Sequence, residues 1–244
     1  MITFALWGFP LGHSFSQTYF RDKFKQLKIE ADYLLASVAS LEEFKTWLLL
    51  NPDLRGFNVT VPFKETALSL VDNLTETAQA VGAINCVKIN PDGSKTGHNT
   101  DADAFRESLM KWLGTNVPSM ALVLGSGGSS KAVRYALQLS GITSMTVSRN
   151  PENGDYTWDF LSPELIQQFP LIINTTPVGM YPNQHLMPPF PITGLTSQHF
   201  VFDLIYNPSE TSLLAAAKNA GATTKNGLEM LHLQAEASWM YWNS

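Results

Sequence analysis

A glycine-rich turn in the middle of the sequence has the residue types and spacing that can hold a phosphate. The apolar run Leu122-Val123-Leu124 leads into Gly125-Ser126-Gly127-Gly128-Ser129-Ser130, and helical periodicity follows. Gly125 permits a tight turn, Gly127 lets the backbone approach a pyrophosphate, and the small Ser130 stands where a third glycine would let helix and strand pack closely. The pyrophosphate would then lie on the helix N-terminal amides. A strand before the turn and a helix after it favour a dinucleotide site over a tight connection without a ligand.

The end of the next predicted strand bears on which dinucleotide fits. An NAD site usually has an acidic residue about twenty residues after the turn, where it binds the ribose hydroxyls. This chain has Ser148 and Arg149 there. A guanidinium can bind a 2′-phosphate with two hydrogen bonds, which favours NADP over NAD. The alternative is a solvated loop arginine, with Glu152 and Asp155 close behind it.

Polar side chains in the first half gather at predicted strand ends and helix starts, which is where open α/β sheets bind ligands. They lie in four segments: Gly12-His13-Ser14-Phe15-Ser16, Asn58-Val59-Thr60-Val61-Pro62-Phe63-Lys64, Gly82-Ala83-Ile84-Asn85 and Asn99-Thr100-Asp101. Each segment also has an ordinary structural interpretation. Serine, threonine and aspartate are good helix N-caps, asparagine can tie a turn, and Lys64 can be a surface lysine.

Lys64 has an unusual predicted position. We expect Pro62 at the first helical residue, which puts this cation in the first turn, where the helix dipole disfavours positive charge. The dipole supplies only about 0.3 to 1 kcal/mol, so desolvation in a cleft would have to add to it before the lysine lost its proton easily. A nearby Asp101 would act in the opposite direction and hold the proton until it is needed.

Alternating strand and helix patterns must position these residues. In the first half we expect strands at residues 2–7, 33–36 and 56–61, a hairpin of 83–89 and 94–97, and helices from Ser14 or Ser16 through Leu27, at 41–50 and at 102–113. A second alternation begins at Met120, with strands at 144–148, 171–174 and 200–205, helices near 131–139 and 211–220, and an aromatic-rich last helix at 228–242. The polar connection 114–119 separates the two alternations. The fold class is therefore α/β with mainly parallel sheets.

The bulk composition excludes several classes of protein. The net charge of the 244 residues is −5, which argues against nucleic acid as a main partner. A single cysteine, Cys86, excludes an intrachain disulfide and suits a reducing compartment, and the five histidines are too scattered for a metal site. The apolar run at residues 2–7 is too short for a signal or membrane helix. We expect a cytoplasmic, metal-free protein that does not insert into membranes.

Taken together, these segments resemble the shikimate dehydrogenase family over almost the whole chain. Beyond the four segments and the glycine turn, the resemblance rests on Asn174-Thr175-Thr176-Pro177-Val178-Gly179-Met180, Asp203-Leu204-Ile205-Tyr206-Asn207-Pro208, and Gly227-Leu228-Glu229-Met230-Leu231 followed by Gln234. It implies an N-terminal, mainly parallel α/β substrate domain, a Rossmann-type nicotinamide-binding domain, and a cleft between them. The substrate and catalytic domain would comprise residues 1–101 and 226–244, and the NADP domain residues 102–225.

The resemblance also implies a reaction and residue roles. The reaction is the reversible NADPH-dependent reduction of 3-dehydroshikimate to shikimate, in aromatic amino-acid biosynthesis, by a monomer or a homodimer. Lys64 and Asp101 would be the catalytic pair. The residues implied to bind substrate are Ser14 and Ser16 for the carboxylate, and Thr60, Asn85, Tyr206 and Gln234 for the hydroxyls. The residues implied to bind the cofactor are Gly125, Ser126, Gly127, Gly128, Ser129, Ser148, Arg149, Leu204 and Gly227.

The chain departs from the family pattern around the ribose. The usual Asn-Arg-Thr is replaced by Ser148-Arg149-Asn150, no second arginine follows soon after, and residues 151–159 lack helical periodicity. Ser126 and Ser129 stand where the family commonly has alanines. Two alternatives stay open: a quinate/shikimate dehydrogenase that uses NAD, and a non-catalytic nucleotide-binding paralogue. Arg149 argues against the first, and intact Lys64 and Asp101 argue against the second.

Overall fold

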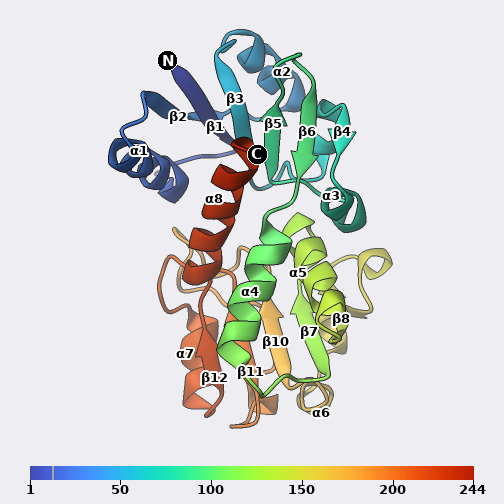
Figure 1. The fold of residues 1–244 in the computed structure, drawn as a ribbon. Helices are drawn as coiled ribbons and strands as arrows, with labels where there is room; N and C mark the ends of the chain where they lie inside the picture. The colour runs from blue at the N-terminus through green and yellow to red at the C-terminus, as the bar shows by residue number, and fades with distance from the viewer. Residues whose placement is uncertain (13) are drawn as a thin grey trace. The chain divides into compact units, whose positions relative to one another are not determined.

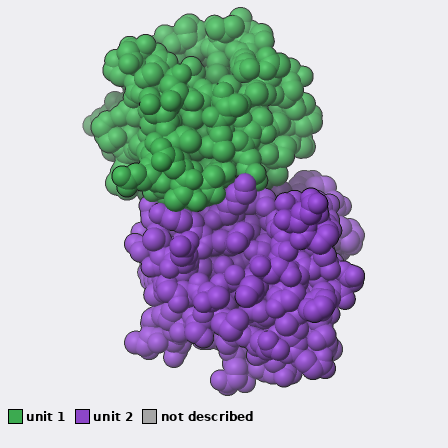
Figure 2. Space-filling view, turned by 90° about the vertical axis from the view of Figure 1, so that its right-hand side faces the viewer, with its two compact units in different colours: residues 1–100, 235–244 green, residues 101–234 purple. Residues whose placement is uncertain are grey.

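The computed structural model describes residues 1–12 and 14–244, which divide into two compact α/β units (Figure 1). Unit 1 comprises residues 1–100 and 235–244, and unit 2 comprises residues 101–234; Figure 2 colours them separately. The last helix, α8 (Leu228–Trp242), contributes its first seven residues to unit 2 and the remainder to unit 1. The assignment of substrate and cofactor roles to predicted domains 1–101 plus 226–244 and 102–225 stays a prediction.

Unit 1 is built on a mixed six-stranded sheet in the order β2-β1-β3-β5-β6-β4. Its strands are β1 (Ile2–Gly8), β2 (Ala31–Ser37), β3 (Leu54–Val59), β4 (Asn73–Leu74), β5 (Cys86–Ile89) and β6 (Lys95–His98). Its helices are α1 (Phe15–Leu27), α2 (Leu41–Leu49), the 3₁₀ helix η1 (Thr66–Leu70) and α3 (Glu76–Val81). β1 pairs in parallel with β2 and β3, whereas β5 pairs antiparallel with β3 and β6. The predicted hairpin in a mainly parallel sheet is confirmed.

Aromatic side chains form much of the core of unit 1. The Trp7 ring stacks between Phe44 and Phe63, with ring centroids 4.2 and 4.4 Å away. In a second buried cluster of unit 1, the Trp242 ring of α8 stacks on the Phe4 ring, with ring centroids 4.5 Å apart. The aromatic residues at the end of α8 are therefore part of the core of unit 1, to which residues 235–244 belong.

Unit 2 is built on a six-stranded sheet whose neighbouring strands pair in parallel, in the order β12-β11-β10-β7-β8-β9. Its strands are β7 (Met120–Leu124), β8 (Thr143–Ser148), β9 (Tyr156–Thr157), β10 (Leu171–Asn174), β11 (Phe200–Asp203) and β12 (Thr223–Lys225). Its helices are α4 (Asp101–Leu113), α5 (Gly128–Leu139), α6 (Pro163–Ile166), α7 (Ser212–Asn219), the start of α8, and the 3₁₀ helices η2 (Pro151–Asn153), η3 (Trp158–Phe160) and η4 (Ile192–Gly194). Counted along the chain from β7, this is the Rossmann strand order, whose switch point lies between β7 and β10.

Two helices cover β7 and carry the apolar face that the sequence pattern predicts. Phe105 and Leu109 of α4 pack with Val133 of α5 and Val123 of β7 in one buried cluster, and α4 and α5 lie side by side in Figure 1. Among the described residues no helix combines the length and the apolar character needed to cross a bilayer.

One local prediction is wrong. Pro62 does not begin a helix: it follows a cis peptide bond in a turn, and η1 begins only at Thr66. The Phe63 amide closes that turn on the Thr60 carbonyl at 2.9 Å, and the Lys64 carbonyl accepts from the Ile84 amide at 2.8 Å. Since η1 begins only at Thr66, Lys64 lies before the helix and not in its first turn, where the dipole was expected to act.

Candidate functional site

Four buried polar residues form one hydrogen-bonded group in unit 1, which we call the strand-end cluster: Asn58, Asn85, Thr100 and Ser238. Asn58 is next to the end of β3, and its Nδ2 donates to the Asn85 carbonyl at 3.0 Å and to the Ser238 hydroxyl at 2.9 Å. Its Oδ1 accepts from the Tyr33 hydroxyl at 2.8 Å. Burial raises the pKa of Tyr33 well above its ordinary value, so this hydroxyl stays protonated and donates.

Asn85 is held rigidly in this cluster. Its Oδ1 accepts from the Thr100 amide at 2.7 Å, and its Nδ2 donates to the Thr100 hydroxyl at 2.9 Å. Two bonds fix the plane of the amide, and among residues 1–12 and 14–244 its second Nδ2 hydrogen has no acceptor. A fixed amide with one donor to spare can bind a substrate hydroxyl.

Thr60 and Lys64 lie in the segment that runs beside Asn85. The Val59 amide donates to the Asn85 carbonyl and the Ile84 amide donates to the Lys64 carbonyl, each at 2.8 Å. Gly8 at the end of β1 makes room for Thr60, because a Cβ there would collide with the Thr60 methyl group. The structure therefore brings together Thr60, Lys64, Asn85 and Thr100, and Asp101 follows Thr100 as the buried first residue of α4.

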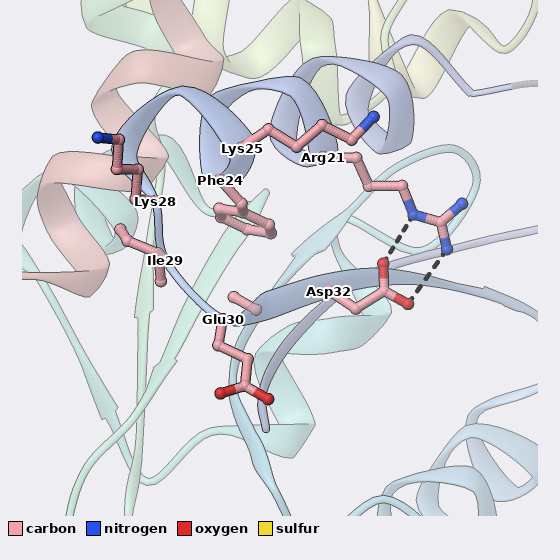
Figure 3. A pocket seen from close by; sticks show the side chains of 8 residues that line it. Arg21, Phe24, Lys25, Lys28, Ile29, Glu30 and Asp32 are labelled. Carbon is pink, nitrogen blue, oxygen red and sulfur yellow. Dashed lines mark hydrogen bonds and ion pairs between the residues drawn. The ribbon is translucent and has the colours of Figure 1, made fainter.

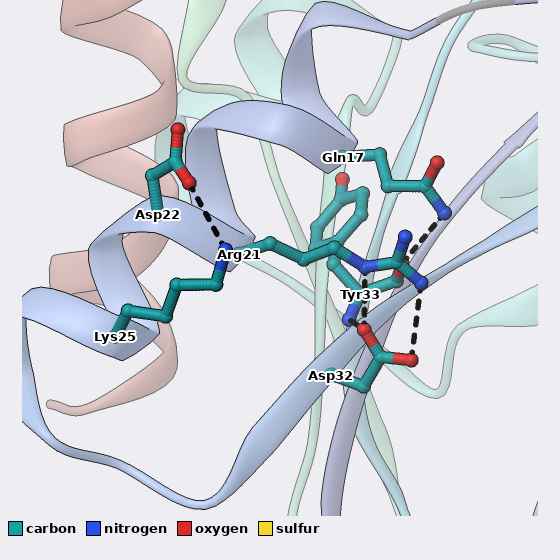
Figure 4. A network of polar contacts seen from close by, with 6 residues as sticks. All are labelled: Gln17, Arg21, Asp22, Lys25, Asp32 and Tyr33. Atoms are coloured by element: carbon teal, nitrogen blue, oxygen red, sulfur yellow. Dashed lines mark hydrogen bonds and ion pairs between the residues drawn. The ribbon is translucent and has the colours of Figure 1, made fainter.

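Ser14 and Ser16 lie at the start of α1, and His13, between Gly12 and Ser14 in the same predicted segment, lies outside the described residues. Ser14 is the N-cap residue, but its side chain makes no capping hydrogen bond. Ser16 is the second residue of α1 and is half-buried. Figure 4 shows what fixes α1 on β2: Gln17 donates to the Tyr33 carbonyl at 3.0 Å, and Arg21 binds Asp32 with bonds of 2.7 and 3.2 Å.

A surface hollow of about 450 Å³ lies at the other end of α1 (Figure 3). Its lining runs from Arg21 to Asp32 and contains no predicted site residue. Arg21 already forms an ion pair with Asp32, and Lys25 Nζ forms one with Asp22 Oδ1 at 3.6 Å. We therefore assign the hollow no part in the site.

In unit 2 the glycine turn lies at the switch point of the sheet. Gly125 has φ +109°, and a Cβ there would lie 2.7 Å from Thr175 Oγ1, so only glycine fits. The Thr175 amide donates to the Leu124 carbonyl at 2.9 Å, which joins the ends of β7 and β10. The crevice outside the carboxyl ends of two such strands is the general ligand site of this fold.

The turn fits a dinucleotide phosphate. Gly127 is the exposed N-cap of α5, and a Cβ on it would meet nothing within 4 Å, which leaves space beside the first turn of the helix. Ser130 is buried, as close packing of α5 requires. Gly227 closes on Leu204, where a Cβ would collide with the Leu204 carbonyl. The two sit together at the end of β11.

At the end of β8, Ser148 lies in the position of the usual ribose-binding acid. Its hydroxyl is 2.9 Å from that of Ser126. Arg149 is exposed and makes no ion pair or side-chain hydrogen bond with the described residues. The carboxylate of Asp155, which follows Arg149 in the same loop, accepts from the Thr146 amide at 2.7 Å. Residues 151–160, which begin with the segment that lacks helical periodicity, form η2, β9 and η3, and the short α6 follows at Pro163.

The loop that contains Tyr206 follows β11, which ends at the buried carboxylate of Asp203. Asp203 accepts from Thr211 Oγ1 at 2.7 Å, Asn174 Nδ2 at 2.9 Å and the Ile205 amide at 3.0 Å. Burial raises the pKa of Asp203 to about 6, against these three donors. Burial also raises the pKa of Tyr206. Gln234, on α8, donates to the Leu231 carbonyl at 3.0 Å.

Sequence reasoning missed Tyr33 and Ser238 as supports of the site. Tyr33 lies on a predicted strand, and Ser238 lies on the last helix directly before Trp239. The available signal was a hydroxyl on an otherwise apolar, buried face. For a metal, no group of three or more potential His, Cys, Asp or Glu ligands occurs in the part of the chain that the structure describes.

The Rossmann strand order and the glycine turn at its switch point define an α/β protein of the dinucleotide-binding class. A family profile described as the shikimate dehydrogenase substrate binding domain matches residues 6–87. The shikimate dehydrogenase (NADP(+)) of Methanococcus maripaludis is 35% identical over 98% of this chain and 90% of its own length. The chain belongs to the shikimate dehydrogenase family, whose members are oxidoreductases.

Solved structures agree with this assignment over the whole chain. The shikimate 5-dehydrogenase of Thermus thermophilus, in complex with NADP(H) and shikimate, is 30% identical and superposes with a TM-score of 0.86 over 99% of this chain and 93% of its own. The quinate dehydrogenase of Corynebacterium glutamicum, in complex with NAD, is 26% identical with a TM-score of 0.88 over 99% of this chain and 93% of its own.

Proposed function

We propose that this protein is a shikimate dehydrogenase, which catalyses the reversible NADPH-dependent reduction of 3-dehydroshikimate to shikimate in aromatic amino-acid biosynthesis. The observation that carries the proposal is the strand-end cluster. It fixes the Asn85 amide beside Thr60 and Lys64, within the segments that the family profile covers. A site built from hydroxyls and amides strongly rejects analogues that lack the hydroxyls it binds.

Each predicted residue has a task in this reaction. Ser14 and Ser16 bind the substrate carboxylate, and Thr60, Asn85, Tyr206 and Gln234 bind its hydroxyls. Bound NADPH supplies the hydride for the C3 carbonyl carbon. Lys64 Nζ donates the proton that the carbonyl oxygen takes up, and Asp101 orients and polarises this lysine. General acid catalysis of this kind is worth about a hundred- to ten-thousand-fold in rate.

The cofactor is bound by residues of unit 2. Gly125, Ser126, Gly127, Gly128 and Ser129 hold the pyrophosphate, and Ser148 and Arg149 lie at the ribose. Leu204 and Gly227 supply backbone around the nicotinamide half, where their close contact leaves no room for a larger residue at 227. The proposal needs neither metal nor nucleic acid. It places a monomer or homodimer in the cytoplasm, where a buried free thiol such as Cys86 stays reduced.

A second candidate is an enzyme that oxidises quinate with NAD. The observation that favours it is the sparse basic character of the ribose loop, in which Arg149 is the lone cation between Ser148 and Phe160. The lack of an acid at residue 148 opposes it, because NAD sites use that acid for the ribose hydroxyls.

A spectrophotometric assay separates these functions. The purified chain is mixed with shikimate or quinate and with NADP⁺ or NAD⁺, and reduced nicotinamide is followed. We expect the highest kcat/KM with shikimate and NADP⁺. Preference for quinate and NAD⁺ would support the second candidate, and no turnover with either acid would support a non-catalytic nucleotide-binding protein.

A further inference from the structure

The hydroxyls of Ser126 and Ser148 lie 2.9 Å apart where β7 and β8 end. Ser126 is the second residue of the glycine turn, and Ser148 is the last residue of β8. The adenine ribose of a dinucleotide binds at the end of the second strand of a Rossmann unit. The pair therefore stands at the predicted ribose position.

The number of hydroxyl hydrogens decides which of the two serines donates in this hydrogen bond. Ser148 is buried, and its Oγ accepts from the Asn150 amide at 3.2 Å. A hydroxyl has one hydrogen to donate, and among the described residues Ser126 Oγ is the acceptor within reach of the Ser148 hydrogen. Because a buried donor without an acceptor is destabilising, Ser148 donates to Ser126. The Ser126 hydroxyl then keeps its own hydrogen for another acceptor.

The surroundings of Ser126 select the chemistry of that acceptor. Arg149 follows Ser148 and is exposed, with no ion pair to the described residues. Of the two acids that follow in this loop, Asp155 is bound to the Thr146 amide, and Glu152 is exposed and forms no ion pair with Arg149 in the described part of the chain. Two donors without a carboxylate suit a phosphate, whose ionised oxygens only accept. A ribose 2′-hydroxyl, which also has a hydrogen to donate, has no carboxylate at residue 148 to accept it.

We propose that Ser126 is a specificity-determining residue that donates a hydrogen bond to the 2′-phosphate of NADP, and that Ser148 is a positioning residue that orients the Ser126 hydroxyl. This inference rests on the proposed function, because it names the contact by which the enzyme prefers NADP. The Ser126 contact also compensates for the second basic residue that the ribose loop lacks.

The test is isothermal titration calorimetry of the full chain with NADP⁺, NAD⁺ and adenosine 2′,5′-bisphosphate. In Ser126→Ala the Kd for NADP⁺ and for the bisphosphate should rise about ten-fold, whereas that for NAD⁺ should change less than about two-fold. Ser126→Thr keeps the hydroxyl and should stay within about three-fold of the wild type. Ser148→Ala should weaken NADP⁺ binding less than Ser126→Ala does, because the donor remains but loses its orientation.

Ser140→Ala is the matched control, since Ser140 lies at the far end of α5 and its hydroxyl donates to the Ala136 carbonyl at 2.9 Å. It should leave all three Kd values unchanged. Equal losses for NADP⁺ and NAD⁺ in Ser126→Ala would overturn the inference, because the hydroxyl would then contact a group that both share. Unchanged NADP⁺ binding in that variant would overturn it too. If the wild type bound neither dinucleotide, the proposed function itself would fail.

Discussion

Asn58 next to the end of β3 donates from Nδ2 to the Ser238 hydroxyl of α8 at 2.9 Å, across 180 residues of sequence. The Ser238 hydroxyl is also 3.3 Å from that of Thr100, whose own hydroxyl and amide fix Asn85. The last helix therefore supports the proposed substrate site through a polar contact, in addition to its aromatic packing.

Replacing Ser238 should destabilise the protein more than replacing another fully buried helical serine. Ser238→Ala leaves one buried Asn58 N–H without its acceptor, which costs about 1 to 3 kcal/mol in the free energy of unfolding. Ser108→Ala is the control: Ser108 donates to Glu229, which two lysines also bind. The free energy of unfolding of Ser108→Ala should fall by less than about 1 kcal/mol. Urea unfolding measures both, and equal losses would contradict the role given to Ser238.

Lys64→Ala should reduce kcat far more than it changes the KM for shikimate. Loss of a positioned proton donor lowers kcat by about a hundred- to ten-thousand-fold. Lys45→Ala is the control, because Lys45 is exposed on α2 and forms its ion pair with Glu42 on the same helix. Steady-state kinetics with shikimate and NADP⁺ measures both variants, and an unchanged kcat in Lys64→Ala would remove Lys64 from the reaction.

Two glycines of the same turn should respond differently to alanine. At Gly125 the positive φ and the contact with Thr175 should cost about 1 to 3 kcal/mol of stability. At Gly127 there is open space, so stability should change by no more than about 1 kcal/mol. The new methyl group should nevertheless weaken NADP⁺ binding, because it occupies the space where the backbone meets the pyrophosphate. Thermal unfolding with NADP⁺ titration separates the two effects; full NADP⁺ affinity in Gly127→Ala would place the phosphate elsewhere.

Arg149→Ala should weaken NADP⁺ binding by about ten-fold or more, because a charge-assisted contact to the 2′-phosphate is lost. NAD⁺ binding provides the internal control and should hardly change. Arg149 makes no ion pair with the described residues, so the fold should keep its stability. An equal loss of affinity for NADP⁺ and NAD⁺ would show that Arg149 does not bind the 2′-phosphate.

Asp203 should make stability fall as the pH rises. Burial raises its pKa to about 6, whereas an unfolded aspartate titrates near about 3.9. The folded protein therefore binds this proton more tightly, and the stability that Asp203 contributes is full below about pH 4 and lost by about pH 6. The free energy of unfolding of the wild type minus that of Asp203→Asn should drop by about 1 to 3 kcal/mol between about pH 4 and 7. Urea titrations across this range measure it; a constant difference would contradict the buried-carboxylate argument.

Elements with either a continuous apolar run or clear helical periodicity could be predicted from the sequence. The strand at residues 171–174 and the helix at residues 228–242 match β10 and α8 at both ends. Short elements such as β4 and α3 could not be predicted, because a strand of two residues or a helix of six has no measurable period. The two-residue strand β9 could not be predicted for the same reason, because it is defined by its pairing with β8.

For the site, the chemical roles of single residues could be predicted from the sequence, but the hydrogen bonds between them could not. The glycine turn has a local signature, since the backbone conformation of Gly125 depends on its own position. The support of Asn85 by Thr100 and Ser238 depends on contacts between distant segments. Likewise, Lys64 lies before η1 and its carbonyl accepts from the Ile84 amide, a contact with a distant segment that the local sequence pattern does not contain.

The division of the chain also has a consequence for biosynthesis. Unit 2 is one continuous stretch, residues 101–234, whereas unit 1 needs residues 235–244 to complete its core. Until residues 235–244 have left the ribosome, Phe4 and Phe20 lack Trp242 and Asn58 lacks Ser238. The part of the chain that is made first therefore finishes folding last, in contrast to the usual N-terminal-first order of nascent chains.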